Sequence, residues 1–365
     1  MSKLDFGVWD AISAFEMSQA STAEVYARHI RLAQEMERLG YHSYWVIEHQ
    51  NSPVGKVTSP CVFLTAIAAN TTRLRFGAMI WQLPFHNPMQ LAQEVAMMDH
   101  LSHGRVEFGS GIGVLEHEFI RWGMNFYERA AVSGEAMDII LRAWTQDEVT
   151  YEGKYWKFDE ALPEPKPFQK PYPPIWIGAH GKPAIEYAAK NNWNLAQNID
   201  TDERVAGNIE YFHSLRKQCG LDGTPPGIFL QRQVHVAETD EKARGEAEQH
   251  LTAARTVQRG EGGPLDKTRV GRGSDASGFG KERDREVNVE LMRVFHESTQ
   301  SYDFSIENGL ALIGSPKTII EKLKEGQERV GYTLFTGNHA FGQMPFELVD
   351  KSIRLFGEEV IPAFR

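Results

Sequence analysis

Cysteine is scarce in this chain of 365 residues, with Cys61 and Cys219 as its only two and no short spacing between them. A disulfide framework or a cysteine-based metal site requires several cysteines at defined spacings, so we expect neither. Long apolar runs are missing as well, because no stretch approaches the roughly 18 residues of a membrane helix. The N-terminus also lacks the basic start and apolar core of a secretory signal. We therefore expect a cytoplasmic protein without a membrane span.

Sustained basic segments are absent too, and the formal net charge is −10. Proteins that bind polyanions usually carry a basic patch, so this charge disfavours nucleic acid as the partner. Hydrophobic residues make up 41% and charged residues 24% of the chain, and both shares are typical of a globular protein. A small-molecule substrate is the more plausible partner.

What the chain does contain is a regular alternation of short apolar runs with helix-period patterns. We predict strands at Leu4–Val8, Ser43–Ile47, Leu74–Ala78, Val106–Gly109, Pro174–Gly178, Asn194–Gln197, Ile228–Val236 and Tyr332–Thr336. Helical patterns follow most of them, for example at Pro60–Asn70, Gly134–Trp144, Glu203–Cys219 and Phe346–Phe364. About eight repeats favour an α/β fold, a TIM (β/α)8 barrel built from residues 1–365 as one domain, over a doubly wound sheet.

Two segments depart from this alternation. Val149–Phe158 alternates around a central Glu-Gly and predicts a β-hairpin outside the barrel, and the proline-rich Pro163–Pro174 should cross the surface in an extended form. Arg259–Glu286 is rich in glycine and charge with almost no large apolar residue. Such a composition cannot bury enough surface to fold alone, so it predicts a long mobile loop or lid.

The ends of the early strands carry the residue types that suit chemistry. Glu48 and His49 come directly after the second predicted strand. Parallel barrels place their active sites at the carboxyl ends of the strands. Because the third and fourth strands are consecutive, residues 78–81 and 110–113 should face the same cleft as His49.

The chain resembles the bacterial luciferase-like monooxygenases over nearly its whole length. The matching segments are Trp45–His49, Leu83–Pro84, His86–Pro88, Asp99 with Ser102–Gly109, the spacing of Gly123, Arg129 and Glu135, Tyr172–Trp176, Gly314–Pro316 and Leu355–Pro362. Their order and spacing together are specific. The resemblance implies a TIM barrel that binds reduced FMN, supplied by a separate flavin reductase, and uses molecular oxygen through a flavin hydroperoxide.

That chemistry would require a closed apolar pocket, because the flavin hydroperoxide must be kept from water and from premature loss of peroxide. Phe6, Trp9, Met79, Trp81 and Phe108 are the side chains that we expect to line it, around a small, apolar organic substrate. His86 would either contact this substrate or cap the helix that Pro88 opens.

His49 matches the catalytic histidine of the luciferases and is the candidate for proton transfer. Its alternative role is that of a strand-end histidine bonded only to Glu48. The family also carries a non-proline cis peptide beneath the flavin ring, and the resemblance places this bond at Met79–Ile80, next to Ala78. An ordinary strand end is the alternative there.

The resemblance is weaker at the cofactor phosphate. The family's arginine would fall at Ile112, and its acidic residue and serine would fall at His180 and Gly181. Backbone amides of Ala179–Lys182 at a helix N-terminus can still bind a phosphate, with charge from Lys182 or His180.

Two further motifs have competing interpretations. The run Gly109, Ser110, Gly111 lacks the third glycine of a dinucleotide fingerprint at the required spacing, so close approach of this backbone to the flavin is the preferred interpretation. Residues 116–118, Glu-His-Glu, have metal-binding types, but adjacent helical residues point apart. We interpret these three as surface charge and expect no metal.

Three functions remain open from the sequence. They are a two-component FMN-dependent monooxygenase, a deazaflavin-dependent dehydrogenase or reductase of the same superfamily, and a non-catalytic partner subunit like that of luciferase. The presence of His49 and of the long loop favours the first. By resemblance, we also expect a homodimer formed through helices early in the barrel.

Overall fold

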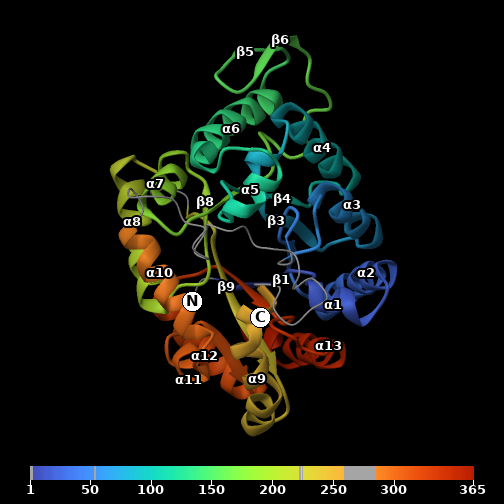
Figure 1. The fold of residues 1–365 in the computed structure, drawn as a ribbon, viewed down its shortest axis with the longest axis vertical. Helices are drawn as coiled ribbons and strands as arrows, with labels where there is room; N and C mark the ends of the chain where they lie inside the picture. The colour runs from blue at the N-terminus through green and yellow to red at the C-terminus, as the bar shows by residue number, and fades with distance from the viewer. Residues whose placement is uncertain (1–2, 53–54, 222, 224, 259–284) are drawn as a thin grey trace.

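The computed structural model describes residues 3–52, 55–221, 223, 225–258 and 285–365, which form a parallel β-barrel surrounded by helices (Figure 1). Eight of the nine strands in the main sheet form a closed ring, because β8 pairs with β9. Around the ring these strands are β9 (Ile228–Val236), β11 (Leu334–Asn338), β1 (Asp5–Asp10), β2 (Ser43–Val46), β3 (Arg75–Gln82), β4 (Val106–Gly111), β7 (Ile175–Gly178) and β8 (Asn194–Gln197). The predicted TIM barrel is confirmed.

Most helices surround this ring (Figure 1). The helices are α1 (Ala14–Gln19), α2 (Thr22–Leu39), α3 (Pro60–Asn70), α4 (Pro88–Leu101), α5 (Glu116–Arg121), α6 (Arg129–Thr145), α7 (Lys182–Lys190), α8 (Asp202–Gln218), α9 (Asp240–Gln258), α10 (Arg285–Ser298), α11 (Tyr302–Glu307), α12 (Pro316–Val330) and α13 (Phe346–Leu355). No helix of the described residues is long and apolar enough to cross a membrane.

Local sequence sets where several helices begin and end. Ser21 starts α2 with a capping box to Glu24, and Gly40 ends it with a φ of 87°. Ser315 starts α12 by accepting from the Thr318 backbone N–H, and Gly331 ends that helix with a φ of 83°. Glycine adopts this left-handed conformation without the steric penalty of a Cβ, so it suits the end of each helix.

The predicted hairpin forms outside the barrel as β5 (Val149–Glu152) and β6 (Lys157–Ala161), at the top of Figure 1. One strand was not predicted: β10 (Ala311–Gly314) pairs with the second half of β9. This pairing is possible because β9 has nine residues, more than the ring requires. The predicted lid at 259–286 lies outside the described residues, except for its last two, which open α10.

Large aromatic side chains fill the inside of the barrel. Trp45 packs edge-on against Trp176 and Phe229, with ring centroids 5.8 and 5.2 Å apart. Gly77 makes this possible, since a Cβ there would lie 2.8 Å from the Trp45 ring. The interior at this level is therefore a packed core.

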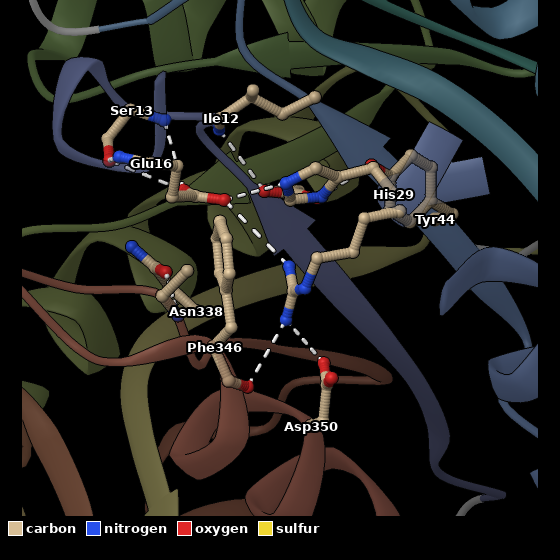
Figure 2. Close-up of polar contacts among 11 residues, drawn as sticks. Ile12, Ser13, Glu16, His29, Tyr44, Asn338, Phe346 and Asp350 are labelled. Atoms are coloured by element: carbon tan, nitrogen blue, oxygen red, sulfur yellow. Dashed lines mark hydrogen bonds and ion pairs between the residues drawn. The ribbon is translucent and has the colours of Figure 1, made fainter. Parts of the chain in front are cut away.

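A buried ionic cluster joins the end of β1 to the first two helices (Figure 2). The His29 ring lies between two carboxylates, with Nδ1 2.6 Å from Asp10 and Nε2 2.6 Å from Glu16. Tyr44 of β2 donates to Asp10 at 2.6 Å. Burial disfavours the charged ring and by itself would lower the pKa of His29. The carboxylates of Asp10 and Glu16 outweigh this effect and raise the pKa of His29 to about 10. His29 is therefore an imidazolium at neutral pH.

This cluster has metal-ligating residue types, and its three ligand atoms lie within 4.8 Å of one another. Both ring nitrogens of His29 are already bonded to carboxylates, so the imidazolium takes the place that a cation would occupy. The adjacent Arg28 extends the network to the last helix, where it bonds Asp350 and the Phe346 carbonyl (Figure 2). The cluster thus links the β1–α1 turn, near the start of the chain, to α13, near its end.

We predict a pH-dependent contribution of His29 to stability. A histidine whose pKa rises on folding stabilises the fold fully below its unfolded value of about 6.5, and this stabilisation is lost as the pH rises towards 10. Replacing it leaves buried carboxylates unpaired, so His29→Gln should lower the free energy of unfolding by about 3–5 kcal/mol at pH 6.5. Urea unfolding should show this gap narrowing by pH 9.5.

The control is His213→Gln, which changes an exposed histidine of α8. It should shift the unfolding free energy by less than about 0.5 kcal/mol at either pH. A gap between wild type and His29→Gln that stays constant or widens with pH would contradict the charged state assigned to His29.

Candidate active site

A cavity of about 110 Å³ opens at the carboxyl end of the barrel. Residues of β1, β9 and β11 and residues that follow β1, β2, β8 and β11 line it, together with side chains from α9, α10 and α11. Among them are Trp9, Ile47, Ile199, Gln231, Gln233 and Asn338. The predicted pocket residue Trp9 therefore does face open space. The β1–α1 turn held by His29 also contributes, since Ala11 and Ser13 line the cavity.

His49 follows β2 at this mouth and is held by a buried carboxylate. Its Nδ1 lies 2.8 Å from Oε1 of Glu118, a fully buried side chain of α5. Because a carboxylate accepts hydrogen bonds, Nδ1 carries the proton and Nε2 presents its lone pair. Glu118 also accepts from the Gln50 backbone N–H at 3.3 Å and from Nε2 of Gln82 at 3.1 Å.

Glu48 binds different partners from those expected. His86 lies 2.9 and 3.0 Å from its two carboxylate oxygens, and Gln50 and the Gln82 backbone donate to it at 2.7 and 2.8 Å. Burial alone would lower the pKa of His86, but the charge of Glu48, its hydrogen bond to the ring and the charge of Glu94 together raise that pKa above its usual value. The alternative in which His49 bonds only Glu48 is therefore wrong.

His86 does not cap the following helix either. Asn87 does, because its side chain accepts from the backbone N–H groups of Met89 and Gln90. His86 is not among the described residues that line the cavity. Its contact with a substrate stays a prediction.

Glu118 corrects the interpretation of residues 116–118 as surface charge. Its side chain is completely buried, and Glu116 receives only a bond from Tyr127 at the surface. The local sign that Glu118 is buried is its apolar neighbour Phe119, which is also buried and shows which side of α5 faces the protein interior. The groups that donate to Glu118 come from His49, Gln50 and Gln82, at the ends of β2 and β3, which are distant from Glu118 in sequence.

The bend in β3 is where the resemblance placed it. The Met79–Ile80 peptide is cis, as predicted, and the Met79 carbonyl accepts from Nε1 of Trp9 at 3.1 Å. Glycines of β4 allow this bend: a Cβ on Gly109 would lie 2.1 Å from the Ala78 carbonyl oxygen, and one on Gly111 would lie 2.1 Å from Ile80. The buried Ser110 lies between them. Approach of this backbone to a flavin stays a prediction.

Three aromatic residues predicted for the pocket wall lie elsewhere. Phe6 packs against Phe356 and Phe364 at 5.5 and 5.1 Å, because Gly7 and Trp9 are the inward positions of β1. Trp81 stacks on Phe108 at 5.0 Å, and Phe108 packs on Trp144 of α6. The register between β3 and β4 shifts between residues 78 and 81, so simple alternation failed there. Phe6, Trp81 and Phe108 belong to the layer between strands and helices.

The predicted phosphate segment forms the start of α7, with Gly181 as its N-cap. No side chain caps this helix. Of its first three residues only Lys182 keeps a backbone N–H for a ligand, because Pro183 has none and the N–H of Ala184 donates to the Gly181 carbonyl at 3.2 Å. Burial lowers the pKa of His180, more strongly than Asp200 raises it, so this ring is neutral. The Lys182 ammonium lies over the Tyr211 ring of α8, 5.6 Å from its centroid.

The positive charge near His180 comes from a residue that the sequence did not indicate. Arg204, in the first turn of α8, donates through Nε to both oxygens of Asp200 at 2.8 and 2.9 Å. Arg204 and Asp200 both lie close enough to act on the pKa of His180. Its position after β8, the strand beside β7, was the available signal.

Residues 4–333 match the family described as luciferase-like monooxygenase. The oxygenase component of flavin-dependent trigonelline monooxygenase from Acinetobacter baylyi is 27% identical over 354 residues, which are 95% of this chain and 92% of that one. The uncharacterised protein y4wF of Sinorhizobium fredii is 33% identical over 195 residues, or 53% of this chain and 56% of y4wF.

Solved structures show the same fold. Monooxygenase RslO1 from Streptomyces bottropensis superposes with a TM-score of 0.80 at 22% identity, covering 99% of this chain and all of RslO1. The oxygenating constituent of 3,6-diketocamphane monooxygenase from Pseudomonas putida, in complex with FMN, gives 0.72 at 19% identity and covers 99% of each chain. Coenzyme F420-dependent tetrahydromethanopterin reductase from Methanopyrus kandleri gives 0.72 at 20% identity and covers both chains fully.

The geometry around Glu118 predicts an order of stabilities. Glu118→Ala removes the acceptor of three hydrogen bonds and should lower the free energy of unfolding by about 3–5 kcal/mol. His49→Ala leaves Glu118 with two donors and should cost about 1–3 kcal/mol. Denaturant unfolding followed by circular dichroism measures both values.

Glu116→Ala, on the same helix, is the matched control and should cost less than about 1 kcal/mol. Equal stabilities of Glu116→Ala and Glu118→Ala would show that the buried contacts of Glu118 do not form in solution.

Proposed function

Because the chain belongs to the luciferase-like monooxygenase family, we propose that it is the oxygenase component of a two-component system. It takes reduced FMN from a separate flavin reductase and uses molecular oxygen to oxidise a small, uncharged and mainly apolar substrate. The observation that carries this proposal is the His49 ring, which a buried carboxylate fixes at the barrel mouth, two residues after the cavity-lining Ile47.

The relatives support the two-component assignment. The trigonelline enzyme is named as an oxygenase component, which implies a partner that reduces the flavin, and it aligns with 95% of this chain. The camphane-degrading relative is solved with FMN bound. The same barrel also serves an F420-dependent reductase, so cofactor choice is the first property to test.

The chain's own residues fit an FMN group. The uncapped start of α7 offers the backbone N–H of Lys182 to a phosphate, and Arg204 brings a guanidinium close to His180. The backbone at residues 78–80 and 109–111 forms the neighbouring part of the mouth. When bound, reduced flavin supplies the electrons that activate oxygen.

His49 would move the proton. With Nδ1 held by Glu118, its Nε2 can accept a proton from the reacting molecules and return it, and the carboxylate steadies the ring in both states. Trp9 and Ile47 exclude water from the cavity beside it. Glu118 acts through His49 and is a positioning residue.

A homodimer is also part of this proposal. Val62 of α3 and Met97 and Leu101 of α4 are 74%, 53% and 62% exposed, and these helices are neighbours. An apolar patch of this kind is a usual site of self-association. Sedimentation velocity should show a dimer for the wild type and a larger monomer fraction for Met97→Glu. A monomeric wild type would contradict the proposed homodimer.

The first functional prediction concerns His49. Loss of a positioned proton carrier typically costs 10²–10⁴-fold, so His49→Ala should lower turnover by about that factor while reduced FMN still binds. Anaerobic titration with reduced FMN and reduced F420, followed by admission of air and substrate screening with a reductase, measures both properties. Tighter binding of F420 than of FMN would favour the dehydrogenase alternative, and wild-type turnover in His49→Ala would contradict the role of His49 as proton carrier.

The second concerns the phosphate. Arg204→Gln should weaken FMN about 10-fold, since a charge-assisted hydrogen bond contributes about 1.5–3 kcal/mol, and should leave riboflavin binding unchanged. Lys190→Gln, at the exposed last turn of α7, is the matched control and should leave the binding of both ligands unchanged. Equal losses for FMN and riboflavin would place Arg204 outside the phosphate site.

A further inference from the structure

Two glutamine side chains in the cavity carry buried polar atoms without hydrogen-bond partners. Nε2 of Gln231 and Oε1 of Gln233 are both enclosed and unpaired, and both side chains line the cavity. Gln231 is only 4% exposed. A buried donor or acceptor left unpaired costs about 1–3 kcal/mol, so a native site normally reserves such atoms for a bound molecule.

The strand register places these two groups side by side at the mouth. Residues two apart on a strand share a face, and Phe229 of the same strand points into the packed interior. Gln231 and Gln233 therefore continue that inward column above the aromatic core. Across the ladder they pair with Thr336 and Asn338 of β11.

The described residues give the cavity no counterion. Its described lining contains no Asp, Glu, Lys, Arg or His, and its other polar groups are the Asn338 amide and the hydroxyls of Ser13, Ser298, Thr299 and Ser305. A carboxylate, sulfonate or ammonium bound there would be buried without a partner, at a high cost in free energy. A neutral ligand with its own donor and acceptor would instead satisfy both glutamines.

Strand order places most of the elements proposed for FMN away from this cavity. The cavity is lined from β8, β9, β11, β1 and β2, whereas the backbone proposed for FMN lies in β3, in β4 and after β7 on the other arc of the ring; Arg204, which follows β8, lies where the two arcs meet. The two unpaired atoms therefore lie on the arc left for the substrate. Its volume of about 110 Å³ resembles the roughly 150 Å³ cavity that holds one benzene ring.

We propose that Gln231 and Gln233 recognise the amide group of the substrate, which is a small, neutral cyclic amide. The ligand carbonyl accepts from Nε2 of Gln231, and the ligand N–H donates to Oε1 of Gln233. A glutamine carries a donor and an acceptor on one carbon, so the pair complements an amide in either direction. This assignment deepens the proposed function and depends on it for the identity of the substrate.

The test uses three six-membered probes on the wild-type protein: 2-piperidinone with N–H and C=O, cyclohexanone with C=O alone, and cyclohexane with neither. Trp9 lines the cavity, so tryptophan fluorescence and ligand-observed NMR report binding. Affinity should fall about 10-fold at each step, because each step leaves one glutamine atom unpaired. Equal affinities, or no binding of 2-piperidinone, would overturn the assignment without any variant.

Two variants separate the roles of the two glutamines. Gln231→Leu removes the donor and should weaken 2-piperidinone and cyclohexanone about 10-fold each. Gln233→Leu removes the acceptor and should weaken 2-piperidinone alone. Gln249→Leu, at an exposed position of α9, is the matched control and should change neither. Losses that do not depend on the probe would indicate a merely structural role and contradict the proposal.

FMN affinity, measured on the same variants, keeps the two proposals distinguishable. Unchanged FMN binding together with weaker 2-piperidinone binding supports the substrate assignment. If Gln231→Leu weakens FMN and spares 2-piperidinone, the recognised amide edge belongs to the flavin, and the assignment is wrong. Failure of wild type to bind any flavin would refute the proposed function, whereas the probe series is measured without flavin.

Discussion

The hydrogen bond between the His49 ring and the buried Glu118 carboxylate joins the end of β2 to α5 at the barrel mouth. Glu118 also receives Gln82 from the end of β3, so one side chain fixes the ends of two neighbouring strands. A single tautomer of His49 follows from this contact, with the lone pair of Nε2 available at the mouth. The chemistry that we propose depends on that orientation, because proton transfer needs a defined direction as well as a basic group.

Around this contact, the mouth divides into two arcs. On one arc, the β3 bend, the β4 glycines and the start of α7 expose backbone, which suits a large planar cofactor and its phosphate. On the other arc, β9 and β11 present amide side chains and no charge around a small cavity. His49 follows β2, between the two arcs, where a cofactor and a substrate would meet.

Much of this architecture follows from patterns that are local in sequence. Helix caps such as Ser21 and Gly40, and the apolar run Ser43–Ile47, predict elements directly, and the alternation of elements predicts the barrel. The cis peptide at Met79–Ile80 and the position of His49 came from the resemblance. These features depend on short segments, which a sequence displays in full.

The errors concern partners that only the folded chain brings together. Glu118 has the neighbours of a surface residue in sequence, but strands more than 30 residues away bury it. Trp81 and Phe108 face the helices because the β3 bend shifts the pairing with β4, which alternation does not reveal. The roles that we propose for Arg204 and the two cavity glutamines likewise depend on neighbours that other strands of the ring supply.

A crystal structure of the protein soaked anaerobically with reduced FMN tests the central claim most directly. The account predicts the flavin ring over the Met79–Ile80 peptide, the phosphate at the start of α7 and Nε2 of His49 facing the ring, with Nδ1 still bonded to Glu118. A flavin bound elsewhere, or a His49 ring turned away from it, would contradict the account.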